Sequence, residues 1–151
     1  MSHVRQQIRK RVVSRLLGNL TALVGSRVYA SRVLPLTSEV MPAVCVYTPG
    51  EKPGSDETLS GCMRALDLFC DIYVAGEDPD ELMDQISSGI EKALYSDQER
   101  GRYLGGLAMG IKAPPAMATT LQGEGESLHG IMRLMFKVLY QTQDGDPEHA
   151  G

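Results

Sequence analysis

The stretch Cys62-Met-Arg-Ala-Leu-Asp-Leu-Phe-Cys-Asp-Ile-Tyr-Val-Ala75 carries the clearest strand pattern in the sequence. Successive residues of a β-strand point to opposite faces of a sheet, so its apolar even positions share one face. These positions are Leu66, Leu68, Cys70, Ile72 and Val74. The odd positions between 67 and 73 carry two aspartates and two aromatic residues. The pattern predicts a strand with its even face in the core.

Four further segments predict strands. Residues 27–31 form a short one, and residues 43–48, which follow Pro42, are apolar nearly throughout, as is typical of a central strand. Residues 107–121 predict a strand that two consecutive prolines interrupt. Residues 128–142 predict a long last strand whose alternate apolar side chains face inward.

Two segments predict amphipathic helices. The first has apolar residues every four positions, at Val4, Ile8, Val12 and Leu16. Its arginines fall on the wet side, and Gly18 with Asn19 ends it. The second begins at Asp78-Pro-Asp-Glu81, where an aspartate caps the helix and proline takes its first position. It continues through an apolar stripe of Leu82, Ile86, Ile90, Ala93 and Leu94 to about Tyr95.

This order of elements predicts an α+β fold: an antiparallel or mixed β-sheet of about five strands with two helices packed on one face. We expect residues 1–142 to form a single domain, residues 49–61 to form a mobile loop, and residues 143–151 to form a disordered C-terminal tail. The sheet face that bears Asp67, Asp71, Arg133 and Lys137 is then either in water or shared with a partner.

Composition narrows the function. The chain has 151 residues with 15 Lys and Arg against 19 Asp and Glu, a net charge of −4, which argues against general nucleic-acid binding. Three cysteines, Cys45, Cys62 and Cys70, show no Cys-x-x-Cys spacing, so neither a disulfide framework nor a zinc site is predicted, and folding in the cytoplasm is favoured. The first seven residues lack an apolar signal core, and no stretch approaches the roughly 18 apolar residues that span a bilayer.

The residue pattern favours no catalytic site, and we expect neither an enzyme nor a cofactor. The three histidines, His3, His129 and His149, fall in the two ends of the chain and in a turn, where none is well placed as a base. The acids of Asp78-Pro-Asp-Glu81 and Asp84 are read as helix capping, with a weak divalent site at an interface left as the alternative.

Charge is distributed unevenly along the chain. The first seven charged residues are all basic: Arg5, Arg9, Lys10, Arg11, Arg15, Arg27 and Arg32. The first acid is Glu39. A basic beginning and an acid-rich middle offer patches of opposite sign for contacts between subunits.

Several segments resemble a known family in their order along the chain. They are Val4-Arg-Gln-Gln-Ile-Arg-Lys-Arg-Val-Val13, Arg27-Val-Tyr-Ala-Ser-Arg32, Met41-Pro-Ala-Val-Cys-Val-Tyr-Thr-Pro-Gly-Glu51 and Asp71-Ile-Tyr-Val-Ala75, followed by an acid-capped helix. Over roughly residues 1–142 the chain resembles the phage tail terminators of the minor tail protein U family, found in long-tailed bacteriophages and in prophages derived from them.

The resemblance implies a small α/β domain, not an enzyme, that closes as a homohexameric ring on the end of the tail tube. Such a ring stops polymerisation and presents the surface that docks to the head. The implied partners are further copies of the chain, the tail tube protein and a head-completion or connector protein, with no membrane and no sequence-specific nucleic acid. The implied location is the virion tail, with assembly in the bacterial cytoplasm.

Two groups of residues are the candidate contacts with a neighbouring subunit or the tube. The basic group is Arg5, Arg9, Arg11, Arg27 and Arg32, and the loop group is Glu51, Lys52, Asp56 and Glu57. We expect the loop to become ordered against the tube or to line its lumen, and a plain solvent loop is the alternative. Two other functions stay open: another head–tail connector or tail-completion protein, and a small-molecule-binding regulatory domain with an apolar pocket.

Overall fold

The strand over Cys62–Ala75 lies in the middle of a seven-stranded sheet in the computed structural model. The structure describes residues 2–31, 41–54, 62–123 and 128–151. The strand order is β1-β2-β3-β8-β6, and β7 and β9 also pair with β8. The strands are β1 Val28–Ala30, β2 Ala43–Pro53, β3 Cys62–Ala75, β6 Gly110–Ile111, β7 Ala116–Gln122, β8 His129–Gln143 and β9 Asp146–Ala150. Because β1 runs parallel to β2 while the other described pairs are antiparallel, the sheet is mixed.

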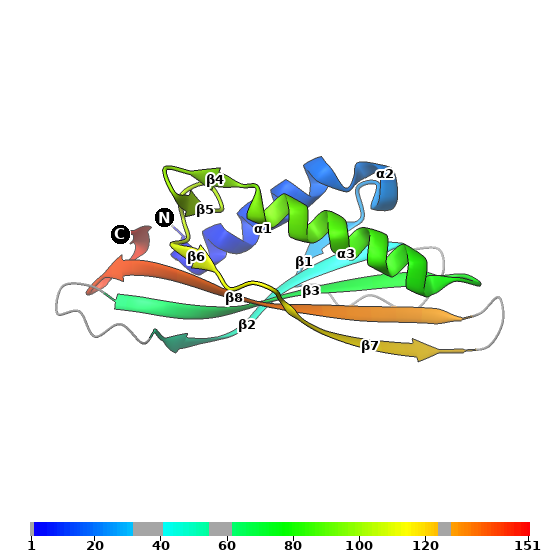
Figure 1. Ribbon diagram of the computed structural model, residues 1–151. Helices are drawn as coiled ribbons and strands as arrows, with labels where there is room; N and C mark the ends of the chain where they lie inside the picture. Colours follow the sequence, from blue (N-terminus) through cyan, green and yellow to red (C-terminus); the bar gives the residue numbers. More distant parts are fainter. Residues whose placement is uncertain (1, 32–40, 55–61, 124–127) are drawn as a thin grey trace.

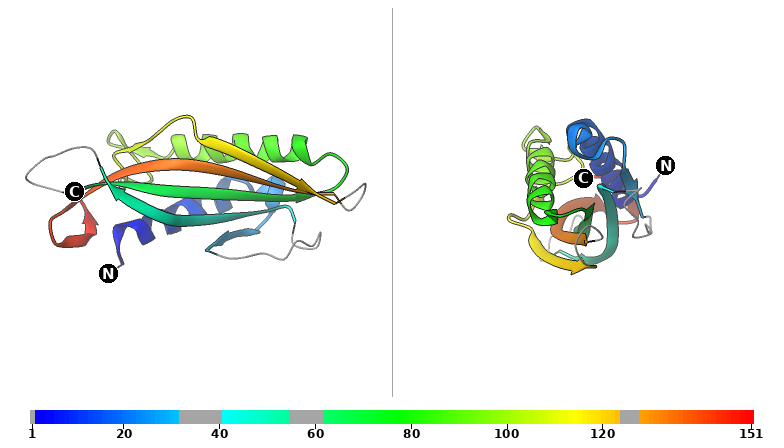
Figure 2. Two further views of the ribbon diagram at one scale, coloured as in Figure 1. Left: turned by 90° about the horizontal axis from the view of Figure 1, so that it is seen from below. Right: turned by 90° about the vertical axis from the view of Figure 1, so that its right-hand side faces the viewer.

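All the helices of the described residues lie on one face of this sheet (Figure 1). They are α1 Val4–Asn19, α2 Thr21–Val24 and α3 Pro79–Tyr95. The two long helices lie side by side along the sheet, with α1 over β1 and β2 and α3 over β3 and β8 (Figure 2). The predicted α+β class is therefore confirmed. The sequence did not predict α2, because a helix of four residues is too short to show a periodic pattern.

Helix α1 forms where the apolar residues recur every four positions. Val4, Ile8, Val12 and Leu16 are completely buried, as the spacing predicts. Nδ1 of His3 accepts a hydrogen bond from the backbone N–H of Arg5 at 3.2 Å, which caps the first turn. One apolar stripe thus fixes the whole helix against the sheet.

Helix α3 begins as predicted at Asp78, whose side chain accepts a hydrogen bond from the backbone N–H of Glu81. Its buried stripe is Pro79, Met83, Ile86, Ile90, Ala93 and Leu94, so Met83 takes the core position expected for Leu82. A Cβ atom on Gly89 would lie 2.5 Å from Cδ2 of Leu20, and this glycine therefore lets α3 approach the end of α1 closely.

Strands β3 and β8 form the longest pairing of the sheet. Their register runs from Cys62 opposite Thr142 to Ala75 opposite His129. The even positions of both strands face the helices and are buried, as predicted: Leu66, Leu68, Cys70, Ile72 and Val74 on β3, and Met132, Leu134, Phe136, Val138 and Tyr140 on β8. The interrupted strand at 107–121 is also present, as β6 and β7 on either side of the two prolines.

The predicted loop over residues 49–61 is wrong in its first part. Strand β2 continues to Pro53, and after an irregularity between Tyr47 and Gly50 it pairs again with β3. Glu51 lies opposite Leu66 in this second part, and its side chain is only 15% exposed. Pairing with a long neighbouring strand holds this polar segment in the sheet. Residues 55–61 lie outside the described residues.

The prediction of a disordered tail over 143–151 is wrong as well. The chain turns at Asp144-Gly145, where Gly145 has φ +76°, and returns as β9 against the end of β8. The backbone N–H of Gly151 donates to the carbonyl of Gln141 at 2.6 Å. Asp-Gly is a strong hairpin signal, because both residues tolerate the backbone conformation of a tight turn.

A second, two-stranded sheet follows α3. It joins β4 Gln98–Glu99 to β5 Arg102–Tyr103 through a turn in which Arg100 and Gly101 both have positive φ. Strands of two residues carry no alternating pattern, so the sequence did not predict them. None of the helices in the described segments is long and apolar enough to cross a membrane.

Candidate assembly surface

The sheet face opposite the helices carries two cross-strand ion pairs. Nζ of Lys137 lies 2.6 Å from Oδ1 of Asp67, and Arg133 donates to both carboxylate oxygens of Asp71 at 2.8 and 2.9 Å. The guanidinium of Arg133 also lies over the ring of Phe69, 4.8 Å from its centre. Opposite charges facing each other across two strands stabilise the β3–β8 register.

These pairs neutralise charge within the subunit. The side chain of Asp71 is only 4% exposed, and its hydrogen bond to Arg133 raises the pKa of that guanidinium. Toward β2 the same face carries a second cluster of buried residues: Met41, Ala43, Cys45 and Tyr73. The face expected to be wet or shared with a partner is thus partly apolar and holds its charges in pairs.

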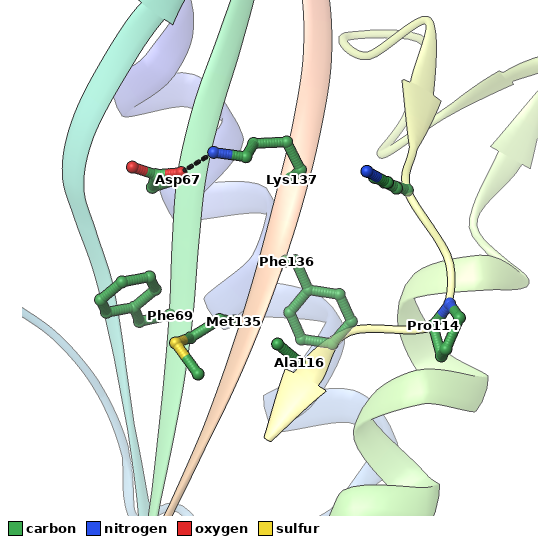
Figure 3. A pocket seen from close by; sticks show the side chains of 8 residues that line it. Asp67, Phe69, Pro114, Ala116, Met135, Phe136 and Lys137 are labelled. Carbon is green, nitrogen blue, oxygen red and sulfur yellow. Dashed lines mark hydrogen bonds and ion pairs between the residues drawn. The ribbon is translucent and has the colours of Figure 1, made fainter. Parts of the chain in front are cut away.

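A hollow of about 420 Å³ lies between this face and the connection from β6 to β7 (Figure 3). Its lining is Asp67, Phe69, Lys112, Pro114, Ala116, Met135, Phe136 and Lys137. Two of its three charged residues, Asp67 and Lys137, bond to each other rather than into the space. A small-molecule site needs polar groups that converge on a ligand. This hollow offers mainly apolar walls.

Strand β7 forms an outer edge of the sheet. It pairs with β8 through all seven of its residues, and no other strand in the described part of the chain pairs with it. All seven residues, Ala116-Met-Ala-Thr-Thr-Leu-Gln122, are exposed, and none of them is charged. Met117 is 57% exposed and Leu121 is 47% exposed.

The opposite edge of the sheet is built differently. It consists of the three-residue β1 and the part of β2 beyond it, residues 47–53. That part contains two prolines, an irregularity in its pairing and the exposed Lys52. Short strands, prolines, bulges and lysines are the features that prevent an edge from pairing with another chain. The β7 edge, which we call the open edge, has none of them between residues 116 and 122.

Two of the predicted contact residues, Arg5 and Glu51, lie together in the structure. Nη1 of Arg5 lies 3.1 Å from Oε2 of Glu51, and Nη1 of Arg64 lies 3.4 Å from the same oxygen. The hydroxyl of Tyr140 donates to Oε1 of Glu51. Burial, followed by this hydrogen bond, raises the pKa of Tyr140. The cluster ties the start of α1 to β2, β3 and β8.

The other predicted arginines also have partners inside the subunit. Arg9 donates to the hydroxyl of Thr48 at 2.6 Å, and Arg27 donates to the carbonyl of Pro42 at 2.8 Å. Arg11 donates to both carboxylate oxygens of Asp97, at 2.9 and 2.8 Å. The predicted residues Arg32, Asp56 and Glu57 lie outside the described residues.

Sequence reasoning did not find the residues that complete these contacts. Asp97 and Tyr140 lie more than 80 residues from the arginine and the glutamate that they meet, and Arg64 lies 13 residues from Glu51. One sequence carries no signal for such pairs. The acids at the start of α3 cap the helix through Asp78. Among the residues that the structure describes, no three His, Cys, Asp or Glu side chains are grouped to hold a metal ion.

No family model matches the chain, and no curated protein matches it. Solved structures do resemble it. One is a chain from the virion of a native gene transfer agent (GTA) particle, which is 21% identical, with a TM-score of 0.56 over 93% of this chain and 92% of that chain. Another solved chain is 15% identical, with a TM-score of 0.55 over 91% of this chain and 96% of that chain. Likeness at these identities shows a shared fold along nearly the whole length.

Proposed function

We propose that the chain is a structural component of a phage-like virion, and in particular the subunit of a ring that caps the end of a tail tube. The observation that carries the proposal is the likeness to a chain of a GTA virion, which extends over 93% of this chain and 92% of the other. The segments that resemble tail terminators in their order along the chain also support this class. In this role the protein ends tail polymerisation and forms the joining surface to the head, as a structural and not a catalytic component.

The two long helices offer surfaces suited to a ring. A closed ring is built from head-to-tail contacts, in which two different patches of each subunit meet. Exposed acids gather at the start of α3, at Asp78, Asp80, Glu81 and Asp84, whereas the exposed charges of α1 are basic, at Arg5, Lys10 and Arg11. Because α1 and α3 lie side by side on the sheet (Figure 2), the basic flank of one subunit can meet the acidic flank of the next.

Native mass is the first test. Sedimentation across concentration and salt series should show growth toward six subunits, either for the protein alone or after purified tail tubes are added. Capped tubes should then stop lengthening. If neither the free protein nor the protein with tubes assembles, the ring proposal is wrong. Capping of tubes distinguishes a terminator from another head–tail connector, which would bind a head-completion protein and leave tube growth unchanged.

Charge reversal should be made at Lys10, because reversal at Arg5 or Arg11 also breaks contacts within the subunit. Lys10→Glu keeps the fold and should weaken ring formation, most clearly at low salt, where opposite charges attract over a longer distance. Lys112→Glu is the matched control, since Lys112 is an exposed lysine on the connection between β6 and β7 rather than on α1. Equal assembly of both variants would contradict the role of the α1 flank.

A further inference from the structure

The open edge is built to accept another strand. Alternate residues of an edge strand direct their backbone N–H and C=O groups away from the sheet, where they can pair with a second chain. Residues 116–122 carry no charge and no proline, whereas the opposite edge at β1 and β2 carries protective features. Of these two edges, the open edge is therefore the better suited to pair with a strand of another chain.

The residues of the open edge are complementary to a second copy of themselves. An antiparallel pair of β7 strands centred on Thr119 places Thr119 opposite Thr119 and Met117 opposite Leu121. The hydroxyl of Thr119 contacts the sulfur of Met117 at 3.0 Å, so these side chains lie on one face of the strand. The two most exposed large apolar side chains of the described residues would therefore cover each other. Thr–Thr and apolar pairs across strands are favourable.

The rest of the subunit leaves room for this pairing. Met117 and Leu121 lie on the helix side of the sheet, because their partners on β8, Leu134 and Gly130, face that side. Helix α3 packs mainly over β3 and β8, and its contact with β7 is smaller. With strands about 4.8 Å apart, the two β7 strands would hold the two α3 helices well beyond the roughly 10 Å of direct helix packing. The four apolar side chains would line the groove between them.

We propose that the free protein forms a two-fold symmetric dimer in which the open edges of two copies pair antiparallel about Thr119, joining two sheets into one. This contact is isologous, because each copy uses the same patch, whereas ring contacts join different patches. The dimer is therefore a second mode of association that does not depend on the proposed ring. It covers an apolar, uncharged edge that would otherwise invite aggregation.

Charge complementation at the symmetry centre tests the proposal. Thr119→Lys and Thr119→Glu each place two like charges opposite each other, so each variant alone should be monomeric where the unmodified protein is dimeric. An equimolar mixture of the two should restore the dimer, because Lys then faces Glu. Gln143→Lys is the control: it places a lysine at another exposed strand position, outside the open edge, and should leave the dimer intact. Sedimentation velocity compares the unmodified protein, the three variants and the mixture, and circular dichroism checks that each variant is folded.

A crosslink tests the register independently. Cα atoms directly opposite in an antiparallel pair lie about 4.5–5.5 Å apart, which a disulfide can span. In a Cys62→Ser background, Thr119→Cys should therefore oxidise to a covalent dimer, and Ser14→Cys at an exposed position of α1 should not.

A protein that is monomeric at every concentration would overturn the proposal. The proposal would also be overturned if the Thr119→Lys and Thr119→Glu variants were monomeric and their mixture stayed monomeric. It would be overturned too if the protein formed larger assemblies that neither substitution changed. If the monomeric Thr119→Lys variant still capped tubes, the ring would not need the dimer contact.

Discussion

Replacing Asp97 by Asn tests whether the arginines of α1 act within the subunit. Asp97 follows α3 and is 7% exposed. Its carboxylate accepts hydrogen bonds from Nε and Nη2 of Arg11 at 2.9 and 2.8 Å, and Nε of Arg15 lies 3.7 Å away. One carboxylate thus ties the middle of α1 to the segment after α3. Asp97→Asn keeps the shape of the side chain and removes its charge.

The expected loss follows from these contacts. A hydrogen bond to a charged group contributes about 1.5–3 kcal/mol when it is well shielded. The side chain of Arg11 is 42% exposed, so water can hydrate the guanidinium when the carboxylate is lost, and this offsets part of the lost free energy. The Asn side chain also still offers one acceptor oxygen. We expect Asp97→Asn to lower the free energy of unfolding by about 1–2 kcal/mol, above the roughly 0–1 kcal/mol of an exposed ion pair. At this chain length the melting temperature should fall by roughly 2–8 °C.

The loss of unfolding free energy in Asp97→Asn should become smaller as the pH falls. The hydrogen bonds from Arg11 hold the pKa of Asp97 below its ordinary value of 3.8. A carboxyl whose pKa is lower in the folded state contributes stability above its unfolded pKa, and this contribution disappears as the pH falls through the folded value. The difference between the native protein and Asp97→Asn should thus be full at pH 7 and shrink below about pH 3.8.

Urea unfolding at pH 7 and at several acidic pH values measures both quantities. Asp84→Asn is the matched control, because Asp84 is an exposed carboxylate in the second turn of α3. It should change the unfolding free energy by less than about 0.5 kcal/mol. If Asp97→Asn were no more destabilising than this control at pH 7, or if its effect persisted unchanged in acid, the Arg11–Asp97 contact would not be the link that we describe.

Three further outcomes can be measured with single variants or labels. Ile8→Ala removes a completely buried side chain of α1 and should lower the unfolding free energy by about 2–5 kcal/mol in urea, with Ile8→Val losing about 0.5–1.5 kcal/mol. Burial raises the pKa of the Cys70 thiol, so mass spectrometry after alkylation at pH 8 should find this cysteine unmodified until denaturant unfolds the sheet. Gly145→Ala places a side chain at φ +76° and should cost about 1–2 kcal/mol locally, seen as faster hydrogen exchange of the Gly151 amide.

The long elements could be predicted from the sequence because their side chains repeat with a period. Alternation over fourteen residues identified β3, and spacing by four identified α1. The second part of β2 lacks such a pattern, since polar residues and prolines occupy it, and its pairing with β3 depends on a strand elsewhere in the chain. Strand β9 is short and polar, but its Asp144-Gly145 turn was a local signal that the prediction did not use.

The candidate contact residues could be predicted only in part, because the sequence shows charges but not their partners. It placed Arg11 on the wet side of a helix, yet the acid that binds this arginine lies 86 residues further along the chain. The open edge was also missed. The sequence indicated a strand interrupted by prolines, but only the pairing of β7 with β8 shows that residues 116–122 lie at the margin of the sheet.

These internal contacts change what the uneven charge of the chain means for assembly. Arg5 meets Glu51, and Arg11 and Arg15 meet Asp97, so part of the basic beginning of the chain is balanced by acids that are distant in sequence. A neighbouring subunit that bound these arginines would first have to break their contacts within the subunit. This cost would cancel much of the free energy gained from the new contact. Lys10 carries an exposed charge on the same helix. The salt dependence of assembly should therefore follow charge reversal at Lys10, while changes at Arg11 should appear first as a loss of folding stability.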